Sequence, residues 1–415
     1  MTSKLKNQAP GPARGSYADG FESVARLFAH QLERGAEIGA GFTVYRRGEC
    51  VIDLWGGWAD VESERPWERD TRICVFSVTK GFVAMALHLL ADRGQLEWDA
   101  PVAQYWPEFA QSGKAPMTVG TLMGHRGGLA YLDEDFSLSD CTDPGCEGRL
   151  REAMEKQSPN WAIGKDQGYH AITWGMYARE LFERITGGQD VGEFLRNELF
   201  EPLDSDVYVG APESLDAKTA TLYPPATASR VLKMLSNAAT QRQSTEARVF
   251  KKFLTPKSTM RRALLNPSIP DDDITLYNKP PVRRAALGWA SATASAHGVA
   301  RAYLPFASRG TFDGTTYLEE KTLEPVYSRH GWSDNDLVLQ KPVGWSNGFC
   351  KEERHLFCPN AESFGHPGMG GALGWADPVE EVAIGYTMNR MDWRIRSPRI
   401  IALCRKLYDC EAMVE

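Results

Sequence analysis

The sequence predicts an α/β protein with two lobes, in which both ends of the chain form one lobe and a mostly helical segment is inserted between them. Three observations support this. Apolar, β-prone runs lie near the N-terminus, helix and loop patterns fill residues 101–284, and strand and helix signals return after that segment. We therefore assign residues 17–100 and 285–415 to an α/β lobe and residues 101–284 to a helical lobe. A chain of 415 residues is long enough for both.

The N-terminal part begins with a polar segment that is followed by a predicted hairpin. Residues 1–16 are rich in proline, glycine and polar side chains, a composition that predicts a disordered tail. Residues 42–45 and 51–55 are apolar runs typical of strands, and the connector 46–49 reads Arg-Arg-Gly-Glu. We expect the two runs to pair across this connector.

The next apolar segment is predicted to be a central helix. It begins near Ser77 and runs to Arg93, and Gly94 stands where a C-terminal cap belongs. Apolar residues cover most of its circumference, as in a helix that is buried on all sides. We therefore expect this helix to lie in the centre of the molecule.

The inserted segment contains two clear helical patterns. One spans 173–186 and is closed by Gly187-Gly188; the other spans 191–200 and is closed by Pro202. The stretch 267–284 carries three consecutive aspartates and a Pro-Pro pair, which predict an exposed connector. We assign the acidic run to a solvated loop rather than to a metal site.

The last part of the chain returns to mixed structure. Residues 297–307 predict a helix, and residues 372–375 and 382–387 predict paired strands around an Asp-Pro turn. Residues 396–408 predict a closing amphipathic helix. No internal repeat is found.

Composition and charge exclude several classes of function. The 47 Lys and Arg residues are outnumbered by 54 Asp and Glu residues, giving a net charge of −7. A mildly acidic chain is a poor candidate for binding nucleic acid, which requires a clustered basic face. No run approaches the roughly eighteen apolar residues of a membrane-spanning helix. We therefore expect neither nucleic acid nor a membrane as a partner.

The cysteines and the N-terminus indicate a cytoplasmic protein. The eight cysteines are scattered, none forms a C-x-x-C pair, and no His and Cys set has the spacing of a zinc site. The first eight residues lack the apolar core of a secretory signal. We therefore expect reduced thiols in the cytoplasm.

Two S-x-x-K patterns are present, at Ser3/Lys6 and at Ser77/Lys80. Only the second lies on an apolar helix, where a spacing of three places both side chains on one face. Burial lowers the pKa of a lysine, so that Lys80 can accept the proton of Ser77 near neutral pH. The helix N-terminus favours an oxyanion beside the serine. The alternative is that Ser77 caps the helix and Lys80 points to water; the motif alone favours neither.

Two further elements bear on this choice. Tyr169 lies in the loop Gly168-Tyr169-His170-Ala171, just before the helix at 173–186. A tyrosine held near a lysine ammonium can work as a phenolate that relays protons. The run Gly365-His366-Pro367-Gly368-Met369-Gly370-Gly371 permits close backbone approach, and an N–H there can complete an oxyanion hole with that of Ser77.

A competing motif is present near the C-terminus. Gly344-Trp345-Ser346-Asn347-Gly348 satisfies G-x-S-x-G, the nucleophile elbow of α/β-hydrolases. That motif requires a buried strand before it and a helix after it, whereas polar residues flank it here on both sides. No aspartate stands between Ser346 and the later His355 or His366, so the usual order of a triad fits poorly. We therefore favour Ser77 over Ser346.

The three elements around Ser77, Tyr169 and Gly368 occur in the order found in the serine β-lactamase and penicillin-binding protein superfamily, which the chain resembles. It is most similar to the branch of β-lactamase-like carboxylesterases and transesterases (family VIII). The resemblance covers about residues 20 to 410. The sequence segments that support it are Val75-Phe76-Ser77-Val78-Thr79-Lys80, Asp99-Ala100-Pro101-Val102 with Tyr105-Trp106-Pro107, and Leu122-Met123-Gly124-His125-Arg126-Gly127-Gly128-Leu129.

The resemblance implies a central antiparallel sheet flanked by helices, and a mechanism through an acyl-enzyme. Ser77 is then the nucleophile, with Lys80 and Tyr169 as the proton-transfer pair. His366, before Gly368, replaces the lysine of the K-T-G element, and the N–H of Met369 takes the second oxyanion position. In addition, we assign Trp345 to the wall of the substrate cleft.

The chain departs from the lactam-handling pattern in two places. No asparagine stands two residues after Tyr169, and His366-Pro367-Gly368 lacks the lysine and threonine that engage the carboxylate of a β-lactam. We therefore expect a carboxylesterase that acts on small acyl esters without a metal or organic cofactor. The alternatives are an acyltransferase, a D-amino-acid amidase or peptidase, a weak β-lactamase, and, from a different class, a non-catalytic scaffold.

Overall fold

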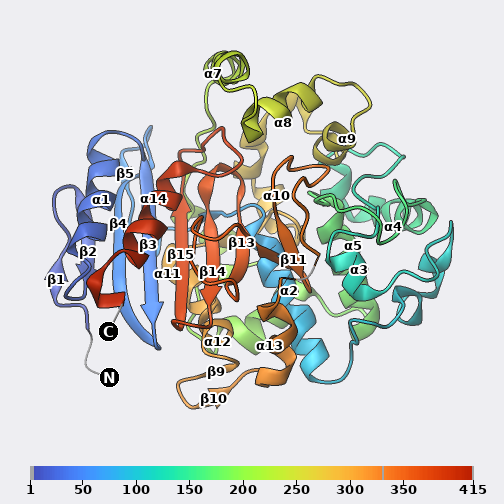
Figure 1. Cartoon of the computed structure of the whole chain (residues 1–415), viewed down its shortest axis with the longest axis horizontal. Helices are drawn as coiled ribbons and strands as arrows, with labels where there is room; N and C mark the ends of the chain where they lie inside the picture. The colour runs from blue at the N-terminus through green and yellow to red at the C-terminus, as the bar shows by residue number, and fades with distance from the viewer. Residues whose placement is uncertain (1–3, 330, 414–415) are drawn as a thin grey trace.

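An antiparallel sheet assembled from both ends of the chain forms the centre of the computed structural model, which describes residues 4–329 and 331–413 (Figure 1). Its ten strands run in the order β1-β2-β4-β3-β15-β14-β13-β12-β11, and β5 pairs with β4. The strands are β1 (Asn7–Gln8), β2 (Ala13–Tyr17), β3 (Gly39–Arg46), β4 (Glu49–Asp60), β5 (Arg65–Pro66), β11 (Gly344–Ser346), β12 (Phe349–Lys351), β13 (Phe364–Pro367), β14 (Leu373–Asp377) and β15 (Val382–Met388). The predicted pairing of the two last strands is confirmed.

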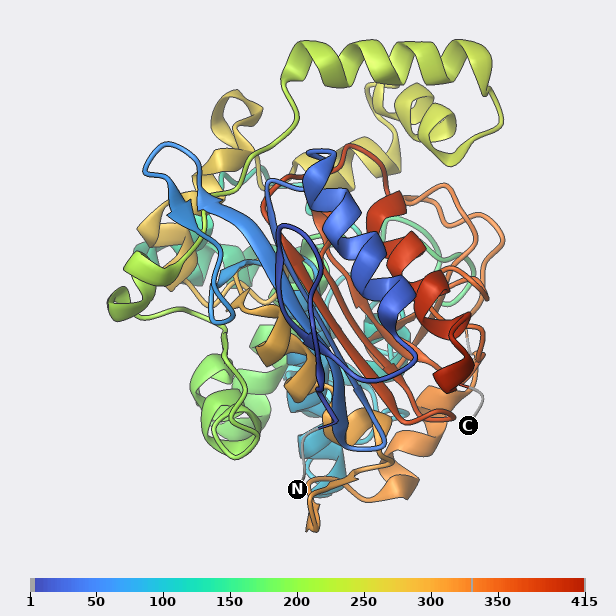
Figure 2. The same ribbon diagram turned by 90° about the vertical axis from the view of Figure 1, so that its left-hand side faces the viewer.

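The predicted hairpin is β3 and β4, joined by Arg47 and Gly48, whose φ angles of 49° and 76° are those of a tight hairpin turn. Every residue of β3 is buried because both faces of the sheet are covered. Helices α1 (Glu22–Glu33) and α14 (Pro398–Tyr408) lie side by side on one face (Figure 2). Helix α11 (Ala296–Ala302) packs on β3 and β15 from the other face.

The prediction of a disordered tail over residues 1–16 is wrong for the part that forms strands; residues 1–3 lie outside the described residues. Strand β2 pairs with β4, and β1 pairs with β2. The glycine content that suggested disorder serves close packing instead. Gly15 has a φ of 96°, and a Cβ there would lie 2.0 Å from the carbonyl oxygen of Asp53.

The inserted segment is helical, as predicted. Helix α5 (Thr173–Thr186) ends at Gly187 with a left-handed φ of 74°, and α6 (Val191–Leu195) continues as a π-helical turn to Phe200. The remaining helices here are α3 (Val119–Met123), α4 (Glu147–Lys156), α7 (Thr227–Thr240), α8 (Thr245–Phe253), α9 (Thr259–Leu265) and α10 (Pro280–Arg284). The lobe boundaries drawn at residues 100 and 285 stay a prediction.

The stretch 267–284 is only in part the exposed connector that its composition suggested: its three aspartates at 271–273 are exposed, as predicted. It forms short helical turns and α10, and Tyr277 within it is buried. The ring of Tyr277 lies 5.0 Å from that of Phe76, and its hydroxyl oxygen accepts the indole N–H of Trp289 at 3.3 Å. The aspartate and proline residues suggested a solvent-exposed segment, whereas Tyr277 makes an aromatic contact next to the start of the central helix.

The predicted central helix is α2 (Val78–Asp92), which is buried along nearly its whole length. It packs against α5, α6 and β13, between the sheet and the inserted helices. The predicted helix at 297–307 is divided into α11 and α12 (Leu304–Ala307) at Tyr303, and α13 (Glu320–Tyr327) follows with the β9–β10 hairpin (Thr311–Phe312, Thr315–Thr316). The eight cysteines all lie in the described part and are free thiols. Among the described helices, none has the length and apolar character needed to cross a membrane.

Candidate active site

A sharp strand-to-helix turn presents Ser77 at the start of α2. Strand β6 (Ile73–Cys74) pairs with β8 (Thr293–Ala294) and leads into the turn. Phe76 has a φ of 47°, a left-handed conformation that costs a bulky residue about 1–3 kcal/mol. Its burial against Tyr277 holds it there. Ser77 is partly exposed although its neighbours on both sides are buried, so the turn brings its hydroxyl to the surface of the core.

Lys80 lies one turn further along α2 and is fully buried. Its Nζ is 3.0 Å from Ser77 Oγ and donates a hydrogen bond to the carbonyl oxygen of Trp289 at 3.0 Å. No carboxylate pairs with it among the described residues. Burial without such a partner lowers the pKa of Lys80 well below its usual value. A neutral amine keeps a lone pair that can accept a proton.

Tyr169 completes the cluster from the loop before α5. Its hydroxyl donates a hydrogen bond to Ser77 Oγ at 2.9 Å, and its ring centre lies 5.1 Å from Lys80 Nζ. The ring of Trp345 stacks on it at 5.2 Å with an interplanar angle of 3°. Burial raises the pKa of Tyr169 above its usual value. Burial therefore favours the phenol form of Tyr169 and the neutral amine form of Lys80.

A buried carboxylate that the sequence analysis missed holds the Tyr169 loop. Asp336 Oδ1 accepts the backbone N–H of Tyr169 at 3.0 Å, and those of Val338 and Leu339 at 2.9 Å each. Its Oδ2 faces the side-chain amide of Gln167 at 3.4 Å. In the sequence, Asp336 stands in a polar run that resembles a surface loop, so no local signal could have found it.

We predict that Asp336→Ala lowers kcat about 10- to 100-fold by letting the Tyr169 hydroxyl drift from Ser77. Three buried N–H groups lose their acceptor, each at a cost of about 1–3 kcal/mol. Asp336→Asn keeps an oxygen at the Oδ1 position and should recover most of the activity. Steady-state kinetics and thermal unfolding of both variants check this. Equal kcat values in the two variants would show that Asp336 does not position Tyr169.

The glycine-rich run forms the end of β13 and the turn after it, facing the start of α2. A Cβ on Gly368 would lie 2.3 Å from the carbonyl oxygen of Val75, so only glycine fits this approach. Among the described residues, neither the N–H of Ser77 nor that of Met369 has a hydrogen-bond partner. Met369 itself is exposed. Both N–H groups are thus available as donors, one at the start of α2 and one in the glycine-rich turn that packs against it.

His366 is buried on β13, near Tyr169 and Trp345, at ring distances of 6.0 and 5.7 Å. Its Nδ1 lies 2.9 Å from the carbonyl oxygen of Pro367, and its Nε2 has no partner among the described residues. Burial and, second, any positive charge on the nearby Lys80 lower the pKa of His366 well below its usual value. The side chain is therefore a neutral imidazole.

The chain resembles a known protein family along nearly its whole length. The family model described as beta-lactamase matches residues 24–403. The chain belongs to the β-lactamase family. It is 31% identical to the esterase/beta-lactamase LipL of Mycobacterium tuberculosis over 372 residues, which are 89% of this chain and 81% of LipL. A further relative, esterase EstB of Burkholderia gladioli, is 38% identical over 120 residues, covering 27% of this chain and 31% of EstB.

Solved structures share the fold over nearly the whole chain. The crystal structure of a family VIII carboxylesterase matches with a TM-score of 0.83 and 31% identity, over 96% of this chain and 99% of that one. A penicillin-binding protein homolog from Caulobacter crescentus matches with a TM-score of 0.81 and 29% identity, over 95% and 99%. The predicted fold, an antiparallel sheet flanked by helices with an inserted helical part, is confirmed.

The other residues that the sequence singled out, Trp345, Ser346 and His170, contact neighbouring side chains and loops and support the structure around them. Trp345 is buried behind Tyr169 and so supports that ring. Ser346 donates to the carbonyl oxygen of Pro325 at 2.9 Å, and its strand continues into a tight turn and β12 rather than into a helix. The nucleophile-elbow geometry is therefore absent at this motif. His170 accepts the N–H of Leu129 at 2.8 Å and holds its own loop.

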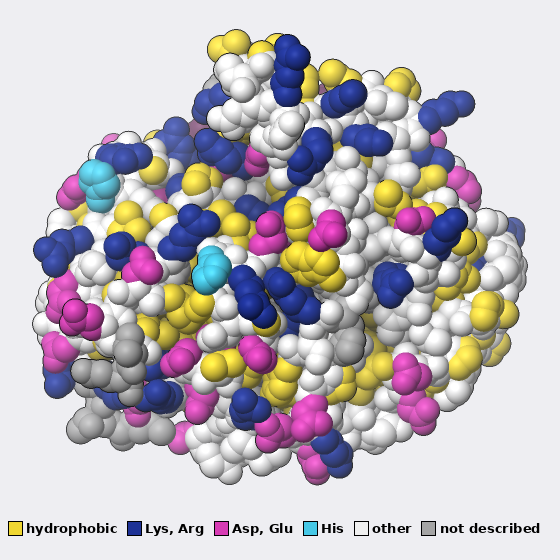
Figure 3. Space-filling model, viewed as in Figure 1, with side chains coloured by type: hydrophobic (Ala, Val, Ile, Leu, Met, Phe, Trp, Pro, Cys, Tyr) yellow, Lys and Arg dark blue, Asp and Glu magenta, His cyan; other side chains and the backbone are white. Residues whose placement is uncertain are grey.

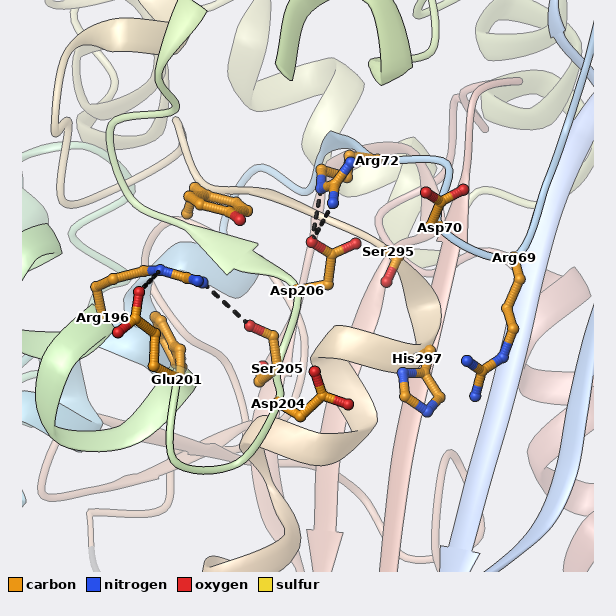
Figure 4. A pocket seen from close by; sticks show the side chains of 12 residues that line it. Arg69, Asp70, Arg72, Arg196, Glu201, Asp204, Ser205, Asp206, Ser295 and His297 are labelled. Carbon is orange, nitrogen blue, oxygen red and sulfur yellow. Dashed lines mark hydrogen bonds and ion pairs between the residues drawn. The ribbon is translucent and has the colours of Figure 1, made fainter. Parts of the chain in front are cut away.

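A polar cavity of about 330 Å³ lies apart from this cluster, and Ser77, Lys80 and Tyr169 are not among its walls (Figure 4). Its charges are largely paired with one another. Arg72 contacts Asp206 at 2.5 Å, and Arg196 contacts Glu201 at 3.0 Å. Among the described residues, no three His, Cys, Asp or Glu side chains gather as a metal site. The Ser77 cluster is therefore the candidate active site.

Proposed function

We propose that this protein is a serine carboxylesterase that works through an acyl-enzyme on Ser77. The observation that carries the proposal is the position of Ser77 Oγ, 3.0 Å from the buried amine of Lys80 and 2.9 Å from the hydroxyl of Tyr169. A nucleophile with a base and an acid on either side has what acyl transfer requires. Lys114 is also buried, but its Nζ donates only to carbonyl oxygens, whereas that of Lys80 lies against the serine hydroxyl, as catalysis requires.

In the acylation step, Ser77 Oγ attacks the ester carbonyl carbon and its proton passes to Lys80 Nζ. The carbonyl oxygen becomes an oxyanion, which the free N–H groups of Ser77 and Met369 stabilise. The bond to the alcohol oxygen then breaks, and Tyr169 gives its proton to that oxygen. Lys80 returns a proton to Tyr169, which restores the phenol and the neutral amine. The products are the free alcohol and an acyl ester of Ser77.

Deacylation repeats these transfers with water in place of the serine hydroxyl. Water gives a proton to the Lys80–Tyr169 pair as its oxygen attacks the acyl carbon, and the pair returns a proton to Ser77 Oγ as that bond breaks. The products are a carboxylic acid and the original enzyme. Each step therefore needs one group that is neutral and basic and one that is neutral and acidic, which matches the directions of both pKa shifts.

The chemistry around His366 favours esters that lack a carboxylate. A substrate carboxylate would need a fixed positive charge at the position that K-T-G enzymes fill with lysine, whereas His366 is a neutral imidazole here. The names of the relatives agree with this choice, since LipL is described as an esterase as well as a β-lactamase, and a solved neighbour is a family VIII carboxylesterase.

The test is a comparison of two substrates on the wild-type protein. We predict that p-nitrophenyl butyrate, a neutral ester, is turned over with a kcat/KM at least about 100-fold above that of the cephalosporin nitrocefin, which carries a carboxylate. Adding a chelator should leave both rates unchanged. A protein that prefers nitrocefin would contradict the proposed substrate class, and one that acts on neither would contradict the proposed activity.

A further inference from the structure

The segment that contains α7, α8 and α9 differs in charge from the rest of the chain. Residues 231–266 carry eight Lys and Arg residues and a single acidic residue, Glu246, in a protein whose net charge is −7. Figure 2 shows α7 lying across the top of the molecule, set off from the sheet and packed beside α8. The chain thus concentrates positive charge on one projecting structure.

The same segment exposes large apolar side chains. On α7, Val231, Leu232 and Leu235 are 44%, 69% and 50% exposed. Their spacing places them on one stripe of the helix, while Asn237 faces α8 through a hydrogen bond to Ser244. Leu254 and Leu264 on the following turns are exposed as well. Five of the nine exposed large apolar side chains among the described residues therefore belong to this segment.

Its basic side chains are largely unpaired. Five of them are exposed and make no ion pair with any described residue: Lys233, Arg242, Lys251, Lys252 and Lys257. By contrast, Arg262 at the base of the segment pairs with Asp133 at 2.8 Å. Figure 3 shows the result along the upper edge of the molecule, where apolar and basic side chains are mixed and acidic ones are few.

We propose that this surface, defined as the exposed side chains of residues 231–266, docks on an anionic lipid membrane. Leucines that enter the boundary between headgroups and acyl chains, beside lysines that meet acidic headgroups, are the features by which peripheral proteins bind such surfaces. The sequence analysis had excluded membranes because no segment can span one. Binding at the surface needs no spanning segment.

Two other occupants fit the surface less well. A second copy of the chain, related by a two-fold axis, would bring the same basic side chains against one another, and like charges oppose such contact. A nucleic acid would satisfy the lysines but would leave the leucines in water, and the aromatic side chains of the segment, Phe250 and Phe253, are partly buried rather than presented for stacking.

The segment is attached on both sides of the candidate active site. Before α7, Tyr223 accepts the N–H of Met391, whose side chain packs next to Gly370 in the glycine-rich turn. On α8, Arg248 donates to the carbonyl oxygen of Gln340, which lies in the loop that Asp336 organises. The segment is therefore connected both to the glycine-rich turn and to the loop that Asp336 organises.

The direct test is flotation of the full-length protein with vesicles. A Ser77→Ala protein is used, so that the result does not depend on the proposed activity. We predict binding to vesicles of phosphatidylglycerol and phosphatidylcholine, and little binding to phosphatidylcholine alone. Raising the salt to about 1 M, where the Debye length falls to about 3 Å, should weaken the binding. Equal binding to both vesicle types, or to neither, would overturn the proposal.

Substitutions in residues 231–266 test whether vesicle binding depends on this surface. Lys251→Glu with Lys252→Glu should weaken binding at least about tenfold, since each basic residue near an anionic bilayer contributes about 1 kcal/mol. Leu232→Asp with Leu235→Asp should weaken it at least as much. The matched controls are Arg26→Glu on α1 with Lys321→Glu on α13, and Val379→Asp; all three positions are exposed and lie outside residues 231–266.

Unchanged binding in the α7 and α8 variants would overturn the proposal, as would equal losses in the control variants. Size-exclusion chromatography and a gel shift with a DNA duplex address the two other occupants. A dimer that the Leu232→Asp, Leu235→Asp change dissociates would overturn the lipid proposal in favour of self-association. Tighter binding to the duplex than to the vesicles would do so in favour of nucleic acid.

Discussion

Replacing Ser77 by alanine is expected to lower kcat for p-nitrophenyl butyrate by about four orders of magnitude or more, because the atom that carries the acyl group is lost. The change removes one exposed oxygen from a partly exposed side chain, so the fold should be retained. Steady-state kinetics measure the effect, and the unfolding temperature of the variant shows whether the protein is intact.

Ser346→Ala is the matched control for Ser77→Ala. It also removes one serine hydroxyl, from the competing motif, and the lost contact is the hydrogen bond to Pro325. We expect wild-type kcat and a small loss of stability of about 1 kcal/mol. Loss of activity in Ser346→Ala with full activity in Ser77→Ala would overturn the mechanism.

Lys80→Arg is predicted to lower kcat by about three orders of magnitude, although a nitrogen donor and most of the side-chain length are kept. Arginine cannot deprotonate in proteins, so the base is lost. The pH dependence follows from the same argument. Burial lowers the pKa of Lys80 well below its usual value and so favours the reactive neutral amine, and the wild-type rate should fall as the pH drops through that lowered pKa.

Lys114 offers a matched control, because it is another buried lysine with a lowered pKa, about 8. Its Nζ donates to three carbonyl oxygens, those of Gln111, Glu155 and Gln157. Lys114→Arg should therefore change stability and leave kcat and its pH profile as in the wild type. If both arginine variants reduce stability and kcat in the same proportion, Lys80 has a structural role only.

Features of the fold that depend on the local sequence were predicted correctly. The start of α2, the Arg47-Gly48 turn and the cap at Gly187 follow from local patterns that physical chemistry restricts to a few conformations. The order of Ser77, Tyr169 and Gly368 added long-range information, because the resemblance supplies the fold in which these segments meet.

What the sequence did not reveal depends on contacts with no local signal. Besides Ser77, the hydrogen-bond partner of Lys80 is the backbone carbonyl of Trp289. Every residue has such a carbonyl, so the type of the residue does not reveal this contact. Asp336 holds the Tyr169 loop from 167 residues away, and its polar neighbours look like any surface loop. Strand β2 was interpreted as a tail because its pairing with β4, rather than its own composition, determines its structure.

The most direct test of the central claim is covalent labelling of the wild-type protein with a fluorophosphonate, followed by peptide mass spectrometry. The phosphonate reacts with an activated serine and stays bound, so the modified residue identifies the nucleophile. We predict a single adduct on the peptide that contains Ser77, formed more slowly in Lys80→Arg and absent in Ser77→Ala. An adduct on Ser346, or an unlabelled protein that still hydrolyses p-nitrophenyl butyrate, would contradict the Ser77 mechanism.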